Sequence, residues 1–187
     1  MYKIAMLSKR IKKNERLYLP EFVYGGIDGA VTTFAVVAGA IGAGLSSSII
    51  LILGFANLFA DGFSMAISNY LSTKSQTEIH IRHKDYQNIK HLGKHPVKCG
   101  FATFFSFFII GLIPLISFVF ALAIPSLDAN KFFYSIIFTA FALFIVGFIK
   151  GEIVKKHPIK SAIETLVIGG IASIIAFIVG YLLRGLA

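Results

Sequence analysis

The chain has 187 residues, of which 56% are hydrophobic and 14% are charged, and its mean hydropathy is +0.79. Soluble domains are typically about 45–50% apolar and about 25% charged, so this balance argues against an ordinary soluble enzyme. The net charge of +9 leaves two classes, a nucleic-acid-binding protein and a membrane protein. The single cysteine, Cys99, excludes an internal disulfide and a cysteine-based zinc site.

Five long, mostly uncharged runs decide between these two classes. A membrane-spanning helix needs about 20 mostly apolar residues. Runs of this kind cover residues 22–44, 48–71, 99–124, 132–149 and 159–183. The sequence therefore predicts an all-α membrane protein with five transmembrane helices. We expect a kink at Pro114 in the third helix, because its ring removes a backbone hydrogen bond. We expect no cleavable signal peptide, because the first run is long and contains Asp28.

The positions of the basic residues predict the orientation. Sixteen of the 18 lysines and arginines lie in the N-terminal tail, between the second and third runs, or between the fourth and fifth. Only Lys131 and Arg184 fall on the opposite side. The positive-inside rule then places the N-terminus in the cytoplasm and the C-terminus on the outer or lumenal side. Most of the net charge is thus a topology signal, and no nucleic-acid partner is expected.

Two regions follow from this topology. Residues 1–21 form a basic cytoplasmic N-terminal tail, and residues 22–187 form one transmembrane domain with a short cytoplasmic loop at about 72–98. This loop holds four of the five histidines, which are spaced three or four residues apart in two pairs: His80, His83, His91 and His95. On a helix each pair would share a face and could bind a metal. The same loop could equally be a solvated basic segment that contacts anionic lipid headgroups.

Carboxylates inside spanning helices cost a few kcal/mol and by default indicate an ion or proton path. The candidates are Asp28, Asp61 and Glu164. Asp28 lies about six residues into the first helix, and Met65 lies about six residues from the end of the second, so we expect similar depths. Asp61 should lie one turn deeper, near Thr32. Glu164 stands near the start of the last helix, where the helix dipole favours a carboxylate, and needs no functional explanation.

The second helix carries one polar stripe at helical spacing, formed by Asn57, Asp61, Ser64 or Met65, Ser68 and Ser72. Packed against the first helix, it predicts a cluster of Asp28, Thr32, Asp61 and Met65. Carboxylate and amide oxygens suit divalent cations, and a thioether favours Fe²⁺ or Mn²⁺ over Mg²⁺ and Ca²⁺. The alternative is that Asp28 caps a helix and Met65 is packing. Small-xxx-small pairs in the first helix, such as Gly25 and Gly29, predict a close helix contact within the protomer or across a dimer.

Several motifs resemble the vacuolar iron transporter (VIT) family. Residues 24–32, YGGIDGAVT, resemble the family's FGxxDGLVT segment, and residues 60–66, ADGFSMA, followed by residues 70–75, resemble its second-helix motif. Residues 111–115 and 150–180 resemble its third helix and its last connection and helix. The resemblance covers about residues 20–185 and includes the order of the motifs along five predicted helices.

The resemblance implies a homodimer that exports cytosolic Fe²⁺, and often Mn²⁺, in exchange for protons. The path would lie at the dimer interface, between the first and second helices. It implies metal binding by Asp28 and Met65. Asp61 is added from its spacing, and possible further ligands are Thr32, Asn57 and Asn69. No enzymatic activity and no resident cofactor are expected, and the partners are a second copy, membrane lipids and the transported ions.

The membrane would be the cell membrane of a prokaryote, or a vacuolar or other acidic-organelle membrane of a eukaryote. The chain departs from plant-type members because the loop at about 72–98 has no Glu-rich metal-binding domain. Two alternatives stay open: a non-transporting membrane protein that senses metal or acts as a scaffold, and a transporter of another cation.

Overall fold

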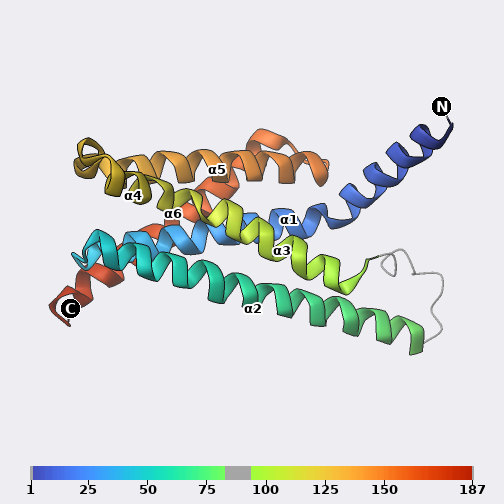
Figure 1. Cartoon of the computed structure of the whole chain (residues 1–187), viewed down its shortest axis with the longest axis horizontal. Helices are drawn as coiled ribbons and strands as arrows, with labels where there is room; N and C mark the ends of the chain where they lie inside the picture. The colour runs from blue at the N-terminus through green and yellow to red at the C-terminus, as the bar shows by residue number, and fades with distance from the viewer. Residues whose placement is uncertain (1, 83–93, 187) are drawn as a thin grey trace.

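The computed structural model describes residues 2–82 and 94–186, and over these residues every regular element is a helix. In chain order the elements are α1 (Tyr2–Gly42), α2 (Ser47–Arg82), α3 (Pro96–Gly111), α4 (Ile113–Ala123), the 3₁₀-helix η2 (Pro125–Asn130), α5 (Lys131–Ile153), α6 (Pro158–Leu183) and the 3₁₀-helix η3 (Arg184–Leu186). Figure 1 shows an elongated bundle with the two chain termini at opposite ends. The predicted all-α class is confirmed.

The described helices match the five predicted spans. Four segments are individually long and apolar enough to cross a membrane: Leu17–Gly42, Ser47–Ile79, Ser126–Ile153 and Pro158–Leu186. Helices α3 and α4 together form a fifth candidate span, bent by 46°. The bend lies at Leu112, two residues before Pro114, which stands in the first turn of α4. The expected kink is confirmed, but its reason differs: the span breaks into two helices before Pro114, and a proline in a first turn removes no hydrogen bond of that helix.

Two helices are longer than the hydropathy predicts. Helix α1 begins at Tyr2 and passes through Pro20, so the N-terminal tail continues into the first span as one helix. Helix α2 continues past the apolar run to Arg82. Charged residues end an apolar run but do not end a helix, because lysine, arginine and glutamate are good helix formers.

Helix α1 lies in the middle of the bundle and packs most extensively against α3 and α6, with smaller contacts to α2 and α5. Glycines permit this close approach: a Cβ added to Gly25 would collide with Ser106, and one added to Gly29 would collide with the backbone of Phe107. The small-residue pair predicted in the first helix thus serves a contact within the protomer, with α3.

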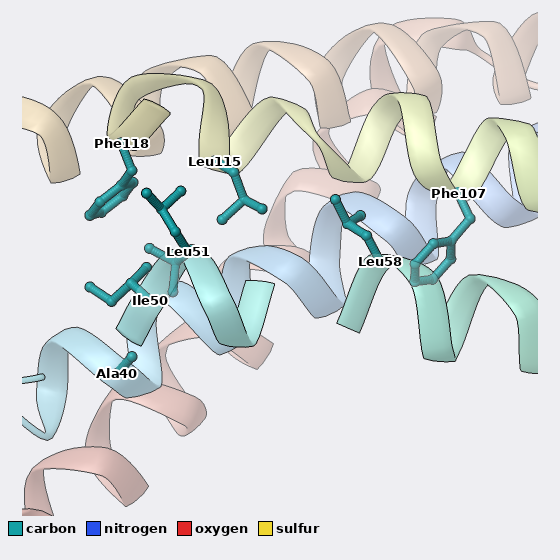
Figure 2. Close-up of a cluster of buried hydrophobic side chains, with 8 residues drawn as sticks. Ala40, Ile50, Leu51, Leu58, Phe107, Leu115 and Phe118 are labelled. Carbon is teal, nitrogen blue, oxygen red and sulfur yellow. The ribbon is translucent and has the colours of Figure 1, made fainter. Parts of the chain in front are cut away.

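An apolar cluster joins the first four helices. Its buried members come from α1, α2, α3 and α4 and are Val37, Ala40, Ile50, Leu51, Leu58, Phe107, Leu115 and Phe118. Figure 2 shows Ile50, Leu51, Leu115 and Phe118 gathered on one side, with Leu58 and Phe107 further along the bundle. The first group packs α2 against α4 near the turn that joins α1 and α2, where Val37 and Ala40 of α1 are also buried.

The opposite end of the bundle, where α1, α3 and α6 begin and α2 and α5 end, is called the basic end below. Among the described residues, it carries the following lysines and arginines of the basic segments: Lys74, Arg82, Lys94, Lys98, Lys150, Lys155, Lys156 and Lys160. Large apolar side chains are exposed along α2, α5 and α6, as expected for helices that face lipid. The arrangement is that of an integral membrane protein whose polar interior lies between α1 and α2.

Candidate metal-binding site

A hydrogen-bonded cluster in the middle of the bundle sets the register of α1 against α2. Asn57 Nδ2 donates to Thr33 Oγ1 at 3.3 Å and to Thr32 Oγ1 at 3.5 Å. Thr32 Oγ1 in turn donates to the backbone oxygen of Asp28 at 2.8 Å. Because the helices run antiparallel, Asp61, one turn after Asn57, lies opposite Asp28. The two carboxylates are within electrostatic range of each other.

This register differs by about one turn from the predicted one, which placed Met65 opposite Asp28 and Asp61 opposite Thr32. The prediction measured depth from the end of the apolar run near Leu71, but α2 continues to Arg82. The end of an apolar run was therefore a poor reference for depth. Asp28, Thr32, Asn57 and Asp61 come together as one polar cluster, and both aspartates are half-buried. Within the described part of the chain no salt bridge reaches either aspartate.

A groove of about 460 Å³ opens between α1 and α2 on the basic-end side of this cluster. It is lined by Pro20, Glu21 and Tyr24 from α1 and by Ser64, Met65, Ser68, Asn69 and Ser72 from α2. Most of the polar stripe predicted on the second helix therefore faces this groove, while Asn57 and Asp61 form its inner continuation. Asp28 and Asp61 lie one to two helical turns beyond it, towards the middle of the bundle.

Met65 takes part in two environments. It lines the groove, and it also packs against the apolar cluster that includes Leu58 and Phe107. A thioether can do both, because its sulfur is a soft ligand while its carbon chain fills space. The two alternatives left open by the sequence, ligation and packing, are compatible in this geometry.

Asn69 lines the groove but is already bonded within the protein. Its Nδ2 donates to Thr103 Oγ1 on α3 at 2.6 Å, and its Oδ1 accepts from Thr73 Oγ1 at 3.4 Å. The bond to Thr103 ties α2 to α3, and the bond from Thr73 lies within α2. Both favour a structural use of this amide over a place in the metal path.

Glu21 is the groove residue that the sequence reasoning missed. It is 7% exposed, its Oε1 accepts a 2.7 Å hydrogen bond from Lys94 Nζ, and its Oε2 is buried without a hydrogen-bond partner among the described residues. It lies seven residues before Asp28, so the two carboxylates share one face of α1. That spacing was a usable signal, but Glu21 falls one residue outside the apolar run and was assigned to the tail.

The histidine pairs cannot be formed from the described residues. His83 and His91 and the side chain of His80 lie outside the described part of the chain. His95 is exposed just before α3, and its backbone N–H donates to the Tyr18 hydroxyl at 3.1 Å. Across residues 2–82 and 94–186 no group of three or more histidine, cysteine or acidic side chains is arranged to hold a metal.

Glu164 is separate from the groove. Its side chain is 61% exposed on α6, and Oε2 lies 3.7 Å from Lys150 Nζ of α5. An exposed pair of this length contributes little stability. The position gives no reason to include it in a metal path, which agrees with the sequence-based interpretation.

The cluster and the groove together offer the ligands of a divalent transition metal. Two facing carboxylates repel each other in a low-dielectric setting, and a divalent cation between them would remove that repulsion. Threonine and asparagine oxygens can complete a hard coordination shell, and the Met65 sulfur adds a softer atom one turn away. These oxygen and sulfur atoms are donors of the kind that suit a divalent cation.

Known proteins match the chain over most of its length. The model of the VIT family matches residues 19–90 and 78–181. A vacuolar iron transporter of Toxoplasma gondii is 30% identical, over 89% of this chain and 74% of that protein. Those of Centaurea cyanus and Arabidopsis thaliana are 29% and 28% identical, over 84% of this chain and 84% and 82% of the relatives. The family match includes all of the groove and the Asp28–Asp61 cluster.

Proposed function

Because the chain belongs to the VIT family, as the sequence motifs predicted, we propose that it moves Fe²⁺, and also Mn²⁺, out of the cytosol in exchange for protons. The relatives named above carry the name vacuolar iron transporter. Members of this family are transporters, so a transport cycle is the activity to be explained. The residues that carry it here are Asp28 and Asp61, with Met65 between them and the cytosol.

The facing aspartates are the observation that carries this proposal. They lie between two spanning helices, within electrostatic range of each other, and without a salt bridge from any described lysine or arginine. Neutralising the charge of such a pair relieves the repulsion between its carboxylates. One divalent cation or added protons can neutralise the same carboxylates, so each displaces the other. That competition supports the proposed exchange of metal for protons.

The path begins at the basic end. The positive-inside rule assigns this end to the cytosol. A cation from the cytosol would enter the groove beside Glu21 and Met65 and then pass to Asp28 and Asp61. Near the turn that joins α1 and α2, the side chains of Val37, Ala40, Ile50 and Leu51 are buried and apolar, which supports a closed outer half. On this proposal the conformation is the one open to the cytosol, and release requires the outer half to open.

A homodimer is part of the proposal. Ser64 and Ser68 are exposed on α2 although they lie within a candidate span, and the neighbouring Ala60 is exposed as well. Small polar residues on a spanning helix favour helix–helix contact over lipid. A second copy packed against this face of α2 would close the side of the groove. We place the dimer in a vacuolar or other acidic-organelle membrane of a eukaryote, or in the cell membrane of a prokaryote.

Transport is tested with the full chain in proteoliposomes. A metal-sensitive dye in the vesicle lumen reports the uptake of Mn²⁺, or of Fe²⁺ kept in the reduced state. Uptake is measured with and without a pH gradient in which the lumen is the acidic side. We expect uptake that the gradient accelerates, and a fall of at least about 100-fold in the Asp28→Asn and Asp61→Asn variants, because each removes a metal ligand. Glu164→Gln, which removes an exposed carboxylate from a spanning helix, is the matched control and should transport normally.

The alternatives give different results in the same assay. A metal sensor or scaffold binds metal without flux. A transporter of another cation shows uptake that Fe²⁺ and Mn²⁺ do not inhibit in a competition panel. Unchanged uptake in both aspartate variants would contradict the assignment of the site.

A further inference from the structure

Lys94 and Glu21 form the most deeply buried ion pair in the described part of the chain. Lys94 Nζ lies 2.7 Å from Glu21 Oε1, and the two side chains are 21% and 8% exposed. The pairs Lys74–Glu78 and Lys150–Glu164 are longer, at 3.9 and 3.7 Å, and more exposed. Lys94 belongs to the loop between α2 and α3, yet its ammonium reaches into the space beside α1.

Only one oxygen of Glu21 is satisfied by this pair. Oε2 is buried and has no hydrogen-bond partner among the described residues. Glu21 also lines the groove together with Met65 and Asn69. The Cys99 thiol lies beside Glu21, but a thiol is only a weak donor. The buried carboxylate oxygen therefore remains costly, and a cation in the groove would stabilise it.

The position of Lys94 is fixed by its neighbours. The next residue, His95, donates its backbone N–H to the Tyr18 hydroxyl of α1 at 3.1 Å, and α3 begins at Pro96. Glu21 and Tyr18 are three residues apart on α1. The start of α3 is therefore attached to α1 beside the groove, and the ammonium is held at one place as a tethered cation.

We propose that Lys94 is a tethered competitor of the transported metal. Its ammonium neutralises Glu21 while the groove is empty, and a divalent cation must displace it to bind Glu21 and Met65. The displacement lowers the affinity of the groove for every divalent cation by the same factor, so Lys94 sets the cytosolic concentration at which the groove fills. This inference rests on the proposed function, since it takes the groove to be the cytosolic opening of the metal path.

Mn²⁺ binding to the purified full chain, followed by the electron paramagnetic resonance signal of free Mn²⁺, tests this proposal without flux. Lys94→Met removes the ammonium and keeps the side-chain length. It should tighten Mn²⁺ binding by about tenfold, because Glu21 is left without a counter-charge. Lys98→Met is the matched control: Lys98 is exposed on the first turn of α3, and its loss should leave binding unchanged.

Two further variants assign the effect. In a Glu21→Gln background, Lys94→Met should no longer change Mn²⁺ binding. Lys94→Arg keeps the ion pair and the fold, and it should bind Mn²⁺ no more tightly than the wild type, because a guanidinium holds a carboxylate through two parallel bonds. This variant remains informative if Lys94→Met proves too unstable to purify.

The proposal is overturned if Lys94→Met leaves Mn²⁺ binding unchanged or weaker, if the tightening persists with Glu21→Gln, or if Lys94→Arg tightens binding. Transport is measured separately. If the variants show the expected pattern of Mn²⁺ binding but the wild-type protein shows no metal flux, the proposed function is contradicted. The competition between Lys94 and the metal would still stand.

Discussion

The two ends of the α1–α2 pair are built in opposite ways. Near their connecting turn, the helices share a dry apolar cluster in which Ile50 and Phe118 are fully buried. Towards the basic end, the same helices border a groove of about 460 Å³ lined by Glu21, Met65 and serines. Because α1 packs more extensively on α3 and α6 than on α2, the pair can be closed at one end and open at the other. Ion-binding groups lie where the packing is incomplete.

The largest loss of stability is expected from breaking the closed end. Phe118→Ala should lower the free energy of unfolding by about 3–5 kcal/mol, because it empties a fully buried site in the apolar cluster. Thermal unfolding in detergent measures the change. Phe120→Ala, at a side chain that is 53% exposed two residues further on, is the control and should have little effect. Equal effects of the two substitutions would contradict the sealing of this end by Phe118.

A smaller loss is expected from separating α1 from α3. A valine at Gly29 would collide with the backbone of Phe107, so Gly29→Val should cost about 1–3 kcal/mol of stability. It should also displace Asp28, its neighbour, and reduce Mn²⁺ affinity. Gly170→Val tests the same change where no atom lies within 4 Å of the added Cβ, and it should be tolerated. A stable, fully active Gly29→Val protein would show that this close contact is unnecessary.

The smallest structural effect is expected at Met65, on the open side. Met65→Leu conserves the side-chain volume and so preserves the contact with the apolar cluster. It should lower the free energy of unfolding by less than about 1.5 kcal/mol. Because the sulfur is lost, the preference for Fe²⁺ and Mn²⁺ over Ca²⁺ in competition uptake should fall several-fold. Unchanged selectivity with unchanged stability would assign Met65 to packing alone.

Hydropathy predicted the candidate spans and the proline predicted the kink near Pro114, because both are properties that are local in sequence. It failed on the ends of α1 and α2, since charged residues continue a helix beyond its apolar run. The one-turn difference in register at Asp61 has the same cause. The approach of Asp28, Thr32 and Asp61 was still predicted, because the stripe on the second helix fixed which face they share.

The ion pair at the groove shows what the sequence could not provide. Lys94 and Glu21 are 73 residues apart and belong to segments without a common periodicity. Their contact depends on how α3 packs against α1, which no local pattern contains. The seven-residue spacing from Glu21 to Asp28 was visible, but only the burial of Glu21 gives that spacing a meaning.

The competition between metal and protons at Asp28 and Asp61 can be tested without measuring flux, from the protons released when metal binds. Mn²⁺ is added to the purified chain in weakly buffered solution, and the pH change is compared with that of the Asp28→Asn/Asp61→Asn double variant. If metal and protons neutralise the same two carboxylates, the wild type releases protons and the double variant releases far fewer. Equal release from both proteins would contradict the assignment of metal–proton exchange to these two aspartates.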